Sequence, residues 1–212
     1  MKKIYLIRHA QSESNARLSI RPNPAIRLTD AGVAQANELC DWLLANITEP
    51  IDGVFRSHYL RTAQTAEPYL AATQQTAGVI EALHEFDYLD FERIKQLQFD
   101  ELIELADEFW RIGDVNYKDG TATDSFANFV NRVQQVRQAF RDLPDGNYIV
   151  FTHGMWIGML IWQILHADGE RVMDMNAFRE YELAIRPKNC EVYLLTHIEQ
   201  AELVTKVRVC DE

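Results

Sequence analysis

The sequence has little of what identifies several protein classes, beginning with cysteine. Its three cysteines, Cys40, Cys190 and Cys210, form an odd set without CxxC spacing. Such a set argues against a disulfide framework and against a zinc site. We therefore expect reduced thiols and no metal centre.

Long hydrophobic runs are also missing. The first run, Ile4–Ile7, stops at Arg8, although a secretory signal needs about 7–15 apolar residues. The longest, Met155–Leu165, contains Gly158 and Gln163 and falls short of the ~20 residues that span a bilayer. We expect a cytoplasmic protein with neither a signal nor a membrane span.

Positive charge is scarce. The 212 residues include 21 Lys and Arg against 32 Asp and Glu, for a net charge of −11. A surface this acidic repels nucleic-acid backbones and anionic lipid, so neither is an expected partner. A small anionic substrate would need a local positive pocket, which makes any cluster of arginines informative. Association into a homodimer is left open.

Signatures of metal-dependent phosphoryl transfer are absent as well. No Walker loop, DFG-like triplet or motif of paired metal-binding carboxylates occurs in the chain. A route through histidine without metal or cofactor therefore fits phosphate chemistry here better than a kinase or metallophosphatase does.

What the sequence does contain is an alternation of strand and helix patterns. Short apolar runs are typical of buried parallel strands, and apolar residues every three or four positions are typical of helices. The strand patterns lie at Lys3–Ile7, Ile51–Arg56, Tyr148–Thr152, Glu191–His197 and Leu203–Val209. The helix patterns lie at Thr29–Ile47, Leu60–Ala72 (with a kink expected at Pro68), Gln98–Arg111, Phe126–Leu143, from Gly154, and around Arg171–Tyr181.

This alternation predicts an α/β fold. We expect a three-layer sandwich in which a mostly parallel central sheet has helices on both faces, formed by one domain over residues 1–212. A small helical cap is expected roughly over residues 86–125.

Ligands of such sheets bind beyond the carboxyl ends of the strands. Arg8 and His9 end the first predicted strand, Ser57–Arg61 follows the second, and His153-Gly154 ends the third. All three should face one crevice. Arginine pairs with two phosphate oxygens at once, and neutral histidine can act as a nucleophile, so this crevice suits a phosphate ester.

Five stretches resemble motifs of one family. Residues 8–15 (RHAQSESN) resemble the RHG-type opening of the histidine phosphatase (phosphoglycerate mutase-like) superfamily, with Ala10 in place of the usual glycine. Residues 28–36 (LTDAGVAQA) resemble its LTxxGxxQA helix start, and residues 57–66 (SHYLRTAQTA) its SPLxRAxQTA element. Residues 83–85 (LHE) are similar to its LxE, and residues 152–154 (THG) to its late HG. The matches follow the family's order over nearly the whole chain.

The resemblance implies a role for each matched residue. His9 would take the phosphoryl group, while Arg8, Arg61 and His153 would hold its oxygens. Glu85 would protonate the leaving oxygen and then activate water. Further substrate contacts are implied for Asn15, the Gly154 backbone and His58, which stands where proline is common.

Several of these residues also have structural interpretations. Glu85 suits a solvated loop position, and Asn15 suits the cap of a turn. His58 and His84 fit either a pocket lining or ordinary loop polarity. Trp156 and Trp162 fit the core, and His166 and His197 fit structural or exposed positions. The aromatic residues around the cap fit either a substrate lid or a small satellite core: Phe86, Tyr88, Phe91, Phe109 and Trp110.

The substrate side departs from the family. Where many members carry a GxWEG stretch, this chain has residues 89–93, LDFER, so the wall of the substrate pocket is rebuilt. If Glu85 is not the acid, Asp87, Asp90 and Glu92 are the candidates on the same stretch.

The resemblance favours a phosphatase. Mutases of the superfamily typically carry a longer insertion between the acid and the late HG, and only 67 residues, 86–152, separate Glu85 from His153 here. Easier access of water favours hydrolysis. A cofactor-dependent phosphoglycerate mutase and a non-catalytic phosphate-binding module are the alternatives.

Overall fold

A computed structural model of the chain describes all residues except 168, 170, 200, 211 and 212. The strands are β1 (Lys2–Arg8), β2 (Gly53–Arg56), β3 (Ala77–Val79), β4 (Gly146–Thr152), β5 (Val192–Ile198) and β6 (Ala201–Arg208). The α-helices are α1 (Asp30–Asn46), α2 (Leu60–Thr73), α3 (Phe91–Ile94), α4 (Phe99–Ile112), α5 (Phe126–Asp142), α6 (Gly154–Leu165) and α7 (Met175–Ile185). Short 3-10 helices occur at Asn23–Ala25 and Glu81–Leu83.

The strands form one mixed sheet in the order β3-β2-β4-β1-β5-β6. β3, β2, β4 and β1 are parallel, and β5 and then β6 add to the β1 side in antiparallel pairs. The α/β fold with a mostly parallel sheet is confirmed. Because parallel strands end at the same edge, β1, β2 and β4 deliver the residues that follow them to one place.

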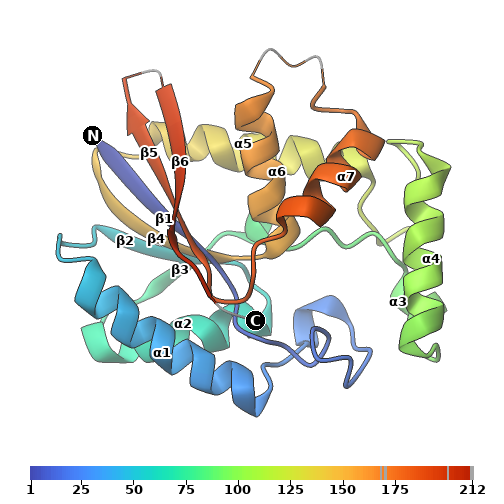
Figure 1. Cartoon of the computed structure of the whole chain (residues 1–212), viewed down its shortest axis with the longest axis horizontal. Helices are drawn as coiled ribbons and strands as arrows, with labels where there is room; N and C mark the ends of the chain where they lie inside the picture. Colours follow the sequence, from blue (N-terminus) through green and yellow to red (C-terminus); the bar gives the residue numbers. More distant parts are fainter. Residues whose placement is uncertain (168, 170, 200, 211–212) are drawn as a thin grey trace.

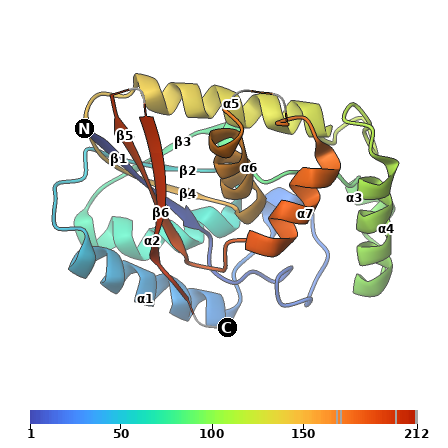
Figure 2. The same ribbon diagram turned by 45° about the horizontal axis from the view of Figure 1, so that its top comes forward.

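Helices cover both faces of the sheet. Figures 1 and 2 show α1 and α2 on one side and α5 and α6 on the other. Along β1, Ile4 and Leu6 belong to the core under α5 and α6, and Tyr5 and Ile7 to the core under α1. All four side chains are buried, because alternate residues of a strand point to opposite faces. The three-layer sandwich is confirmed.

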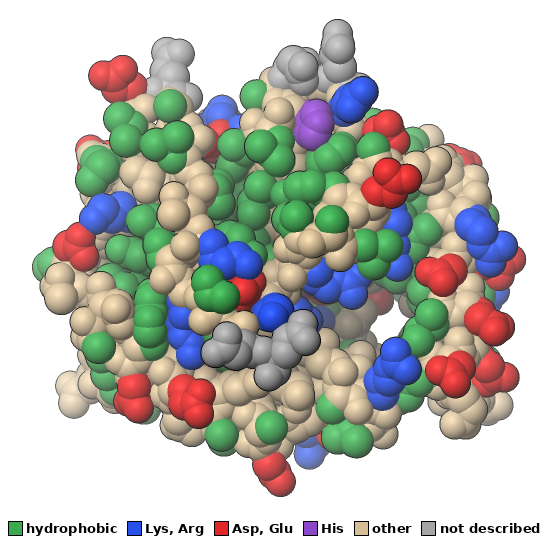
Figure 3. Space-filling view, in the orientation of Figure 1, with side chains coloured by type: hydrophobic (Ala, Val, Ile, Leu, Met, Phe, Trp, Pro, Cys, Tyr) green, Lys and Arg blue, Asp and Glu red, His purple; other side chains and the backbone are tan. Residues whose placement is uncertain are grey.

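The segment that carries α3 and α4 lies beside the sandwich (Figures 1 and 2). Phe109 and Trp110 of α4 are buried, and their rings pack with Phe86, Phe126 and Phe178. Phe86, Phe109 and Trp110 are therefore core residues, but they belong to the main core under α5 and α6 and not to a small satellite core. The surface is hollowed between α4 and the body of the molecule (Figure 3).

Some predicted elements were wrong in position. The helix expected around Arg171–Tyr181 begins instead at Met175, because the Asp174 side chain accepts a hydrogen bond from the Ala177 N–H and caps it there. β3 and α3 were not predicted, since three and four residues are too few to show a period. Pro68 lies inside α2, which remains a single helix. In the described part of the chain, no helix has the length and apolar character needed to cross a bilayer.

Gly32 lets α1 approach the loop after β1. A Cβ atom there would lie 2.0 Å from the Gln11 carbonyl oxygen, which also accepts the Thr29 N–H. We expect Gly32→Ala to lower the free energy of unfolding by about 3 kcal/mol, because the backbone contact cannot relax cheaply. Urea unfolding measures this. Val33→Ala, at an exposed site on the same turn, is the control, and an equal loss in both variants would contradict the steric explanation.

Candidate active site

The residues at the ends of β1, β2 and β4 meet in one crevice. The Arg61 Nε–H donates to His9 Nε2 at 3.1 Å, and His153 Nε2 lies 3.0 Å from Ser57 Oγ. The His9 and His153 ring centroids are 5.2 Å apart. The structure thus brings the three segments together at one edge of the sheet, as the sequence predicted.

His9 is held as a neutral imidazole with a defined tautomer. Its side chain is buried, and Nδ1 lies 2.7 Å from the Ala10 carbonyl oxygen. A carbonyl can only accept, so Nδ1 carries the proton and Nε2 presents its lone pair to Arg61. Burial, together with the Arg61 and Arg8 charges, holds the pKa of His9 well below its usual value. The Nε2 atom is thus suited to nucleophilic attack.

Arg61 is the buried cation next to His9. It is the second residue of α2, and its Nη1 donates to the Asn23 carbonyl oxygen at 2.7 Å. Its guanidinium also lies 4.8 Å from the centroid of the Tyr59 ring. Burial lowers the pKa of Arg61 to about 10, so the side chain stays charged at neutral pH. Asn23 in turn donates to Asp87 Oδ1 at 2.7 Å.

Arg8 and His153 contribute polar atoms that have no protein partner within the described chain. When the Ser57 hydroxyl donates to His153 Nε2, the proton of the neutral ring is on Nδ1. Arg8 Nη1 donates to the Pro187 carbonyl oxygen, but Arg8 Nε and His153 Nδ1 are buried without a hydrogen bond. Burial first, and then the Arg61 charge, keeps the pKa of His153 well below its ordinary value. Buried donors are nearly always paired, so two in one crevice indicate a place for an anion.

Gly154 brings the start of α6 against Arg8. A Cβ atom on Gly154 would lie 3.2 Å from Arg8 Nε, so a side chain would crowd the guanidinium. The first turn of α6 therefore lies next to the Arg8 guanidinium, where the helix dipole favours negative charge.

Glu85 lies at the same helix terminus. Its Oε2 accepts from the Met155 N–H at 3.1 Å, and its Oε1 accepts from the N–H groups of Trp156 at 3.2 Å and Phe86 at 3.0 Å. The side chain is therefore no solvated loop residue. It caps α6 next to His153, a position that serves the fold and also places a carboxylate beside the crevice.

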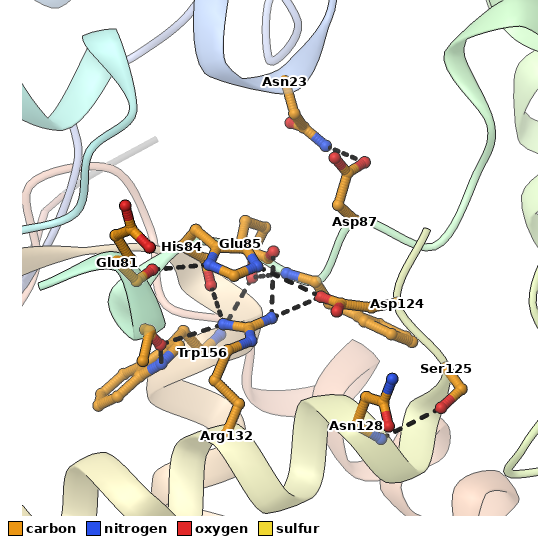
Figure 4. A network of polar contacts seen from close by, with 12 residues as sticks. Asn23, Glu81, His84, Glu85, Asp87, Asp124, Ser125, Asn128, Arg132 and Trp156 are labelled. Atoms are coloured by element: carbon orange, nitrogen blue, oxygen red, sulfur yellow. Dashed lines mark hydrogen bonds and ion pairs between the residues drawn. The ribbon is translucent and has the colours of Figure 1, made fainter. Parts of the chain in front are cut away.

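A network that sequence reasoning missed holds the Glu85 segment (Figure 4). Arg132 of α5 donates to the carbonyl oxygens of Ala82 at 3.1 Å and His84 at 2.6 Å, and to Asp124 Oδ2 at 2.7 Å. The His84 Nε2 atom lies 3.4 Å from the same Asp124 oxygen. Burial alone would raise the pKa of Asp124, but His84 and Arg132 outweigh it and the pKa is lowered. The sequence signal was only an arginine within an amphipathic helix.

Asn15 and His58 lie at the margin of the crevice. Asn15 Oδ1 accepts from the Ser12 N–H at 3.2 Å and from Asn189 Nδ2 at 3.1 Å, and that Nδ2 also donates to the His9 carbonyl oxygen at 2.8 Å. Asn15 thus closes the turn next to the nucleophile candidate. His58 is exposed, and its ring packs against Tyr59 and His84.

The remaining histidines lie elsewhere. His166 packs on Trp162 with ring centroids 3.9 Å apart, and His197 Nε2 lies 3.6 Å from Glu202. Among the residues that the structure describes, no three His, Cys, Asp or Glu side chains are grouped to hold a metal ion.

The His9 environment predicts an imidazole that resists protonation. We expect ¹⁵N NMR to find the proton on Nδ1 at pH 7 and the ring still neutral as the pH falls below 6.5. The urea-unfolded chain, in which histidine titrates near pH ~6.5, is the control. Since the unfolded chain binds more protons in this range, stability should also fall on acidification. A folded-state His9 that titrates at 6.5 or above would contradict the assignment.

Comparison with known proteins finds relatives in sequence and in structure. The curated relative "Probable phosphoglycerate mutase GpmB" of Proteus mirabilis is 27% identical over 202 residues, which cover 91% of this chain and 83% of the relative. The structure of phosphoserine phosphatase from Entamoeba histolytica superposes with a TM-score of 0.73 at 22% identity, over 97% of this chain and 96% of that one. The α-ribazole phosphatase from Shigella flexneri superposes with a TM-score of 0.72 at 19% identity, over 96% and 95%.

These two structural likenesses show the fold. The family follows from the sequence, because the model of the histidine phosphatase superfamily (branch 1) matches residues 4–207. The chain belongs to the histidine phosphatase superfamily.

Proposed function

We propose that the protein is a phosphomonoester hydrolase that acts on a small phosphorylated metabolite through a phosphohistidine at His9. The observation that carries the proposal is the neutral His9, whose Nε2 lone pair faces the crevice with the Arg61 guanidinium. The unpartnered donors Arg8 Nε and His153 Nδ1 support an anion in the same crevice.

In the first step His9 Nε2 attacks phosphorus and the bond from phosphorus to the ester oxygen breaks. The Arg61 guanidinium moves its hydrogen bonds from Nε2 to phosphate oxygens, which frees the lone pair. Arg8 and His153 donate to the same oxygens and stabilise the charge as it spreads. Glu85, in its protonated form, gives its proton to the leaving oxygen, since an alkoxide leaves poorly.

In the second step water attacks the phosphorus of phosphohistidine. The Glu85 carboxylate takes a proton from that water, the N–P bond breaks, and inorganic phosphate leaves. Neutral His9 and protonated Glu85 are restored, so protons and charge balance over the cycle. The two arginines supply the positive charge, so the proposal requires no divalent cation.

Two features support hydrolysis over mutase action. Of the 67 residues between Glu85 and His153, 17 form α5, which packs on the sandwich (Figure 2). Of the other residues in this stretch, the helical ones outside α5 belong to the short α3 and to α4, which has 14 residues. A cap of this size is too small to exclude water from phosphohistidine. The phosphoserine and α-ribazole phosphatases share this fold. The mutase alternative is favoured by the name of the Proteus mirabilis relative.

A non-catalytic phosphate-binding module is the remaining alternative. Members without activity usually lack the histidine or an arginine, but Arg8, His9, Arg61 and His153 are all present. Release of phosphate from a panel of monoesters separates this alternative from an enzyme. Transfer of labelled phosphate between phosphoglycerates separates a mutase from a hydrolase.

Removal of the nucleophile should abolish turnover. We expect His9→Ala to fold and its rate of hydrolysis to fall by more than about 10⁴-fold. Among the described residues, no other nucleophilic group stands in the place of His9 Nε2 next to Arg61. Labelled substrate should leave acid-labile, base-stable phosphate on the natural protein and none on the variant. His166→Ala, which changes a histidine outside the crevice, is the control. Substantial turnover by His9→Ala would refute the mechanism.

The leaving group should decide how much Glu85 matters. We expect Glu85→Gln to slow the burst phase by ~10²–10⁴-fold with alkyl esters and only mildly with activated aryl esters, whose oxygens leave with little protonation. Rapid-quench measurement of the burst isolates this step from hydrolysis of phosphohistidine.

Two controls separate this role from the capping of α6. Thermal unfolding of Glu85→Gln measures the structural loss, and Glu81→Gln changes an exposed carboxylate nearby. Equal losses on both classes of ester would mean that Glu85 acts through structure alone, and would direct attention to Asp87, Asp90 and Glu92.

A further inference from the structure

A groove of about 270 Å³ lies between the segment 14–26 and the segment that carries α3 and α4. Leu102, Ile103 and Ala106 of α4 form one wall, and Ile20 and Ile26 belong to the opposite wall. Most of the lining is therefore apolar. The volume is slightly below the ~300–1,000 Å³ of clefts that hold small ligands.

Two residues of the groove lining also contact the candidate active site. Asn23 lines the groove and accepts the hydrogen bond of Arg61 Nη1, and Arg61 contacts His9 Nε2. Phe86 lines it too and directly follows Glu85. A phosphate held by Arg61 would therefore direct its ester oxygen, and the group beyond that oxygen, toward this groove.

Some of the apolar side chains of α4 line this groove and do not pack into the core. Phe109 and Trp110 are buried in the core under α5 and α6, but Ile103 is 40% exposed and Leu102 is half-buried. Figure 3 shows the surface hollowed beside α4, with hydrophobic side chains of the helix at its edge. Apolar side chains left in contact with water next to a binding site are typical of a ligand surface.

The charged groups of the groove do not suit an alcohol part that carries a negative charge, such as a carboxylate. Arg21 lines it, but its Nε already donates to Glu13 Oε2 at 2.7 Å. Asp87 also lines it and receives the Asn23 amide at 2.7 Å. A carboxylate placed here would meet the Asp87 carboxyl group, and the one cation of the lining is already paired.

We propose that this groove binds the alcohol part of the substrate, and that this part is neutral and apolar. The inference rests on the proposed function and narrows it to phosphate monoesters with an uncharged ring or hydrocarbon group. Carboxylate-bearing esters such as phosphoglycerate are then poor substrates. The rebuilt stretch at residues 89–93 contributes to this preference, because Leu89 belongs to the lining.

Two matched esters test the preference. 2-Phenylethyl phosphate and its para-carboxylate have the same type of leaving alkoxide and differ by a charge far from the ester oxygen. Methyl phosphate is too small to reach the groove, so its rate of hydrolysis measures the chemical step alone. We expect the natural protein to show kcat/KM about tenfold or more higher for the neutral ester than for the carboxylate, within the range that an apolar pocket discriminates.

A pair of variants on one helix locates the effect. Ile103→Lys adds a cation to the groove wall, and Ile112→Lys adds the same charge at an equally exposed site of α4 outside the lining. We expect Ile103→Lys to shift the ratio of neutral to carboxylated ester by about tenfold toward the carboxylate. Ile112→Lys should leave the ratio unchanged and should keep the natural rate with methyl phosphate.

The outcomes separate the two hypotheses. Two results would overturn the groove proposal while hydrolysis of methyl phosphate leaves the proposed function standing. In the first, the natural protein hydrolyses the carboxylated ester as well as the neutral one or better. In the second, Ile103→Lys does not change the ratio of the two esters. No hydrolysis of any of the three esters would overturn the proposed function, and the groove with it.

Discussion

The contact between the Arg61 guanidinium and His9 Nε2 is the interaction on which the rest of the site depends. A cation and an imidazole buried together cannot both be charged at low cost, so His9 stays neutral and Arg61 remains the cation. A buried guanidinium needs partners, and the Asn23 carbonyl and the Tyr59 ring provide them. The same burial that lowers both pKa values creates a positive environment with few mobile groups. In the proposed function, this environment holds the phosphate of the substrate.

The sheet gives this contact its geometry. His9 N–H donates to the Thr152 carbonyl oxygen at 3.0 Å, and Ser57 N–H donates to the Phe151 carbonyl oxygen at 3.1 Å. These bonds continue the parallel ladders beyond the strands and fix where each loop starts. The Ala10 N–H then donates to Thr65 Oγ1 at 3.0 Å and ties the loop to α2. These hydrogen bonds fix the backbone at the start of the loops that carry His9 and Ser57.

In the proposed function, chemistry and substrate selection lie on different parts of the fold. The proposed phosphate site lies at the ends of β1, β2 and β4. The apolar groove lies beside α4, whose Phe109 and Trp110 pack into the core under α5 and α6. Changes on the groove side of α4 can therefore alter the alcohol that is accepted without moving His9 or Arg61. Arg132 fixes the backbone next to Glu85, through its hydrogen bonds to the His84 carbonyl oxygen and to Asp124. The acid candidate therefore keeps its position relative to both regions.

The sequence by itself determined the layers and the strand-end residues. Apolar runs and helical periods are local, and in a parallel sheet they place Arg8, His9, Arg61 and His153 at one edge whatever the details. Boundaries such as the start of α7 were off by a few residues, because a single cap at Asp174 decided them.

Only the tertiary structure decided the partners of those residues. Arg61 finds Asn23 across 38 positions, Arg132 finds Ala82 across 50, and Glu85 finds the N–H of Met155 across 70. Periodicity within one segment carries no record of such pairs, because each depends on how two elements pack. The groove beside α4 could not be predicted for the same reason. An apolar helix face gives the same sequence pattern whether the protein or a ligand covers it.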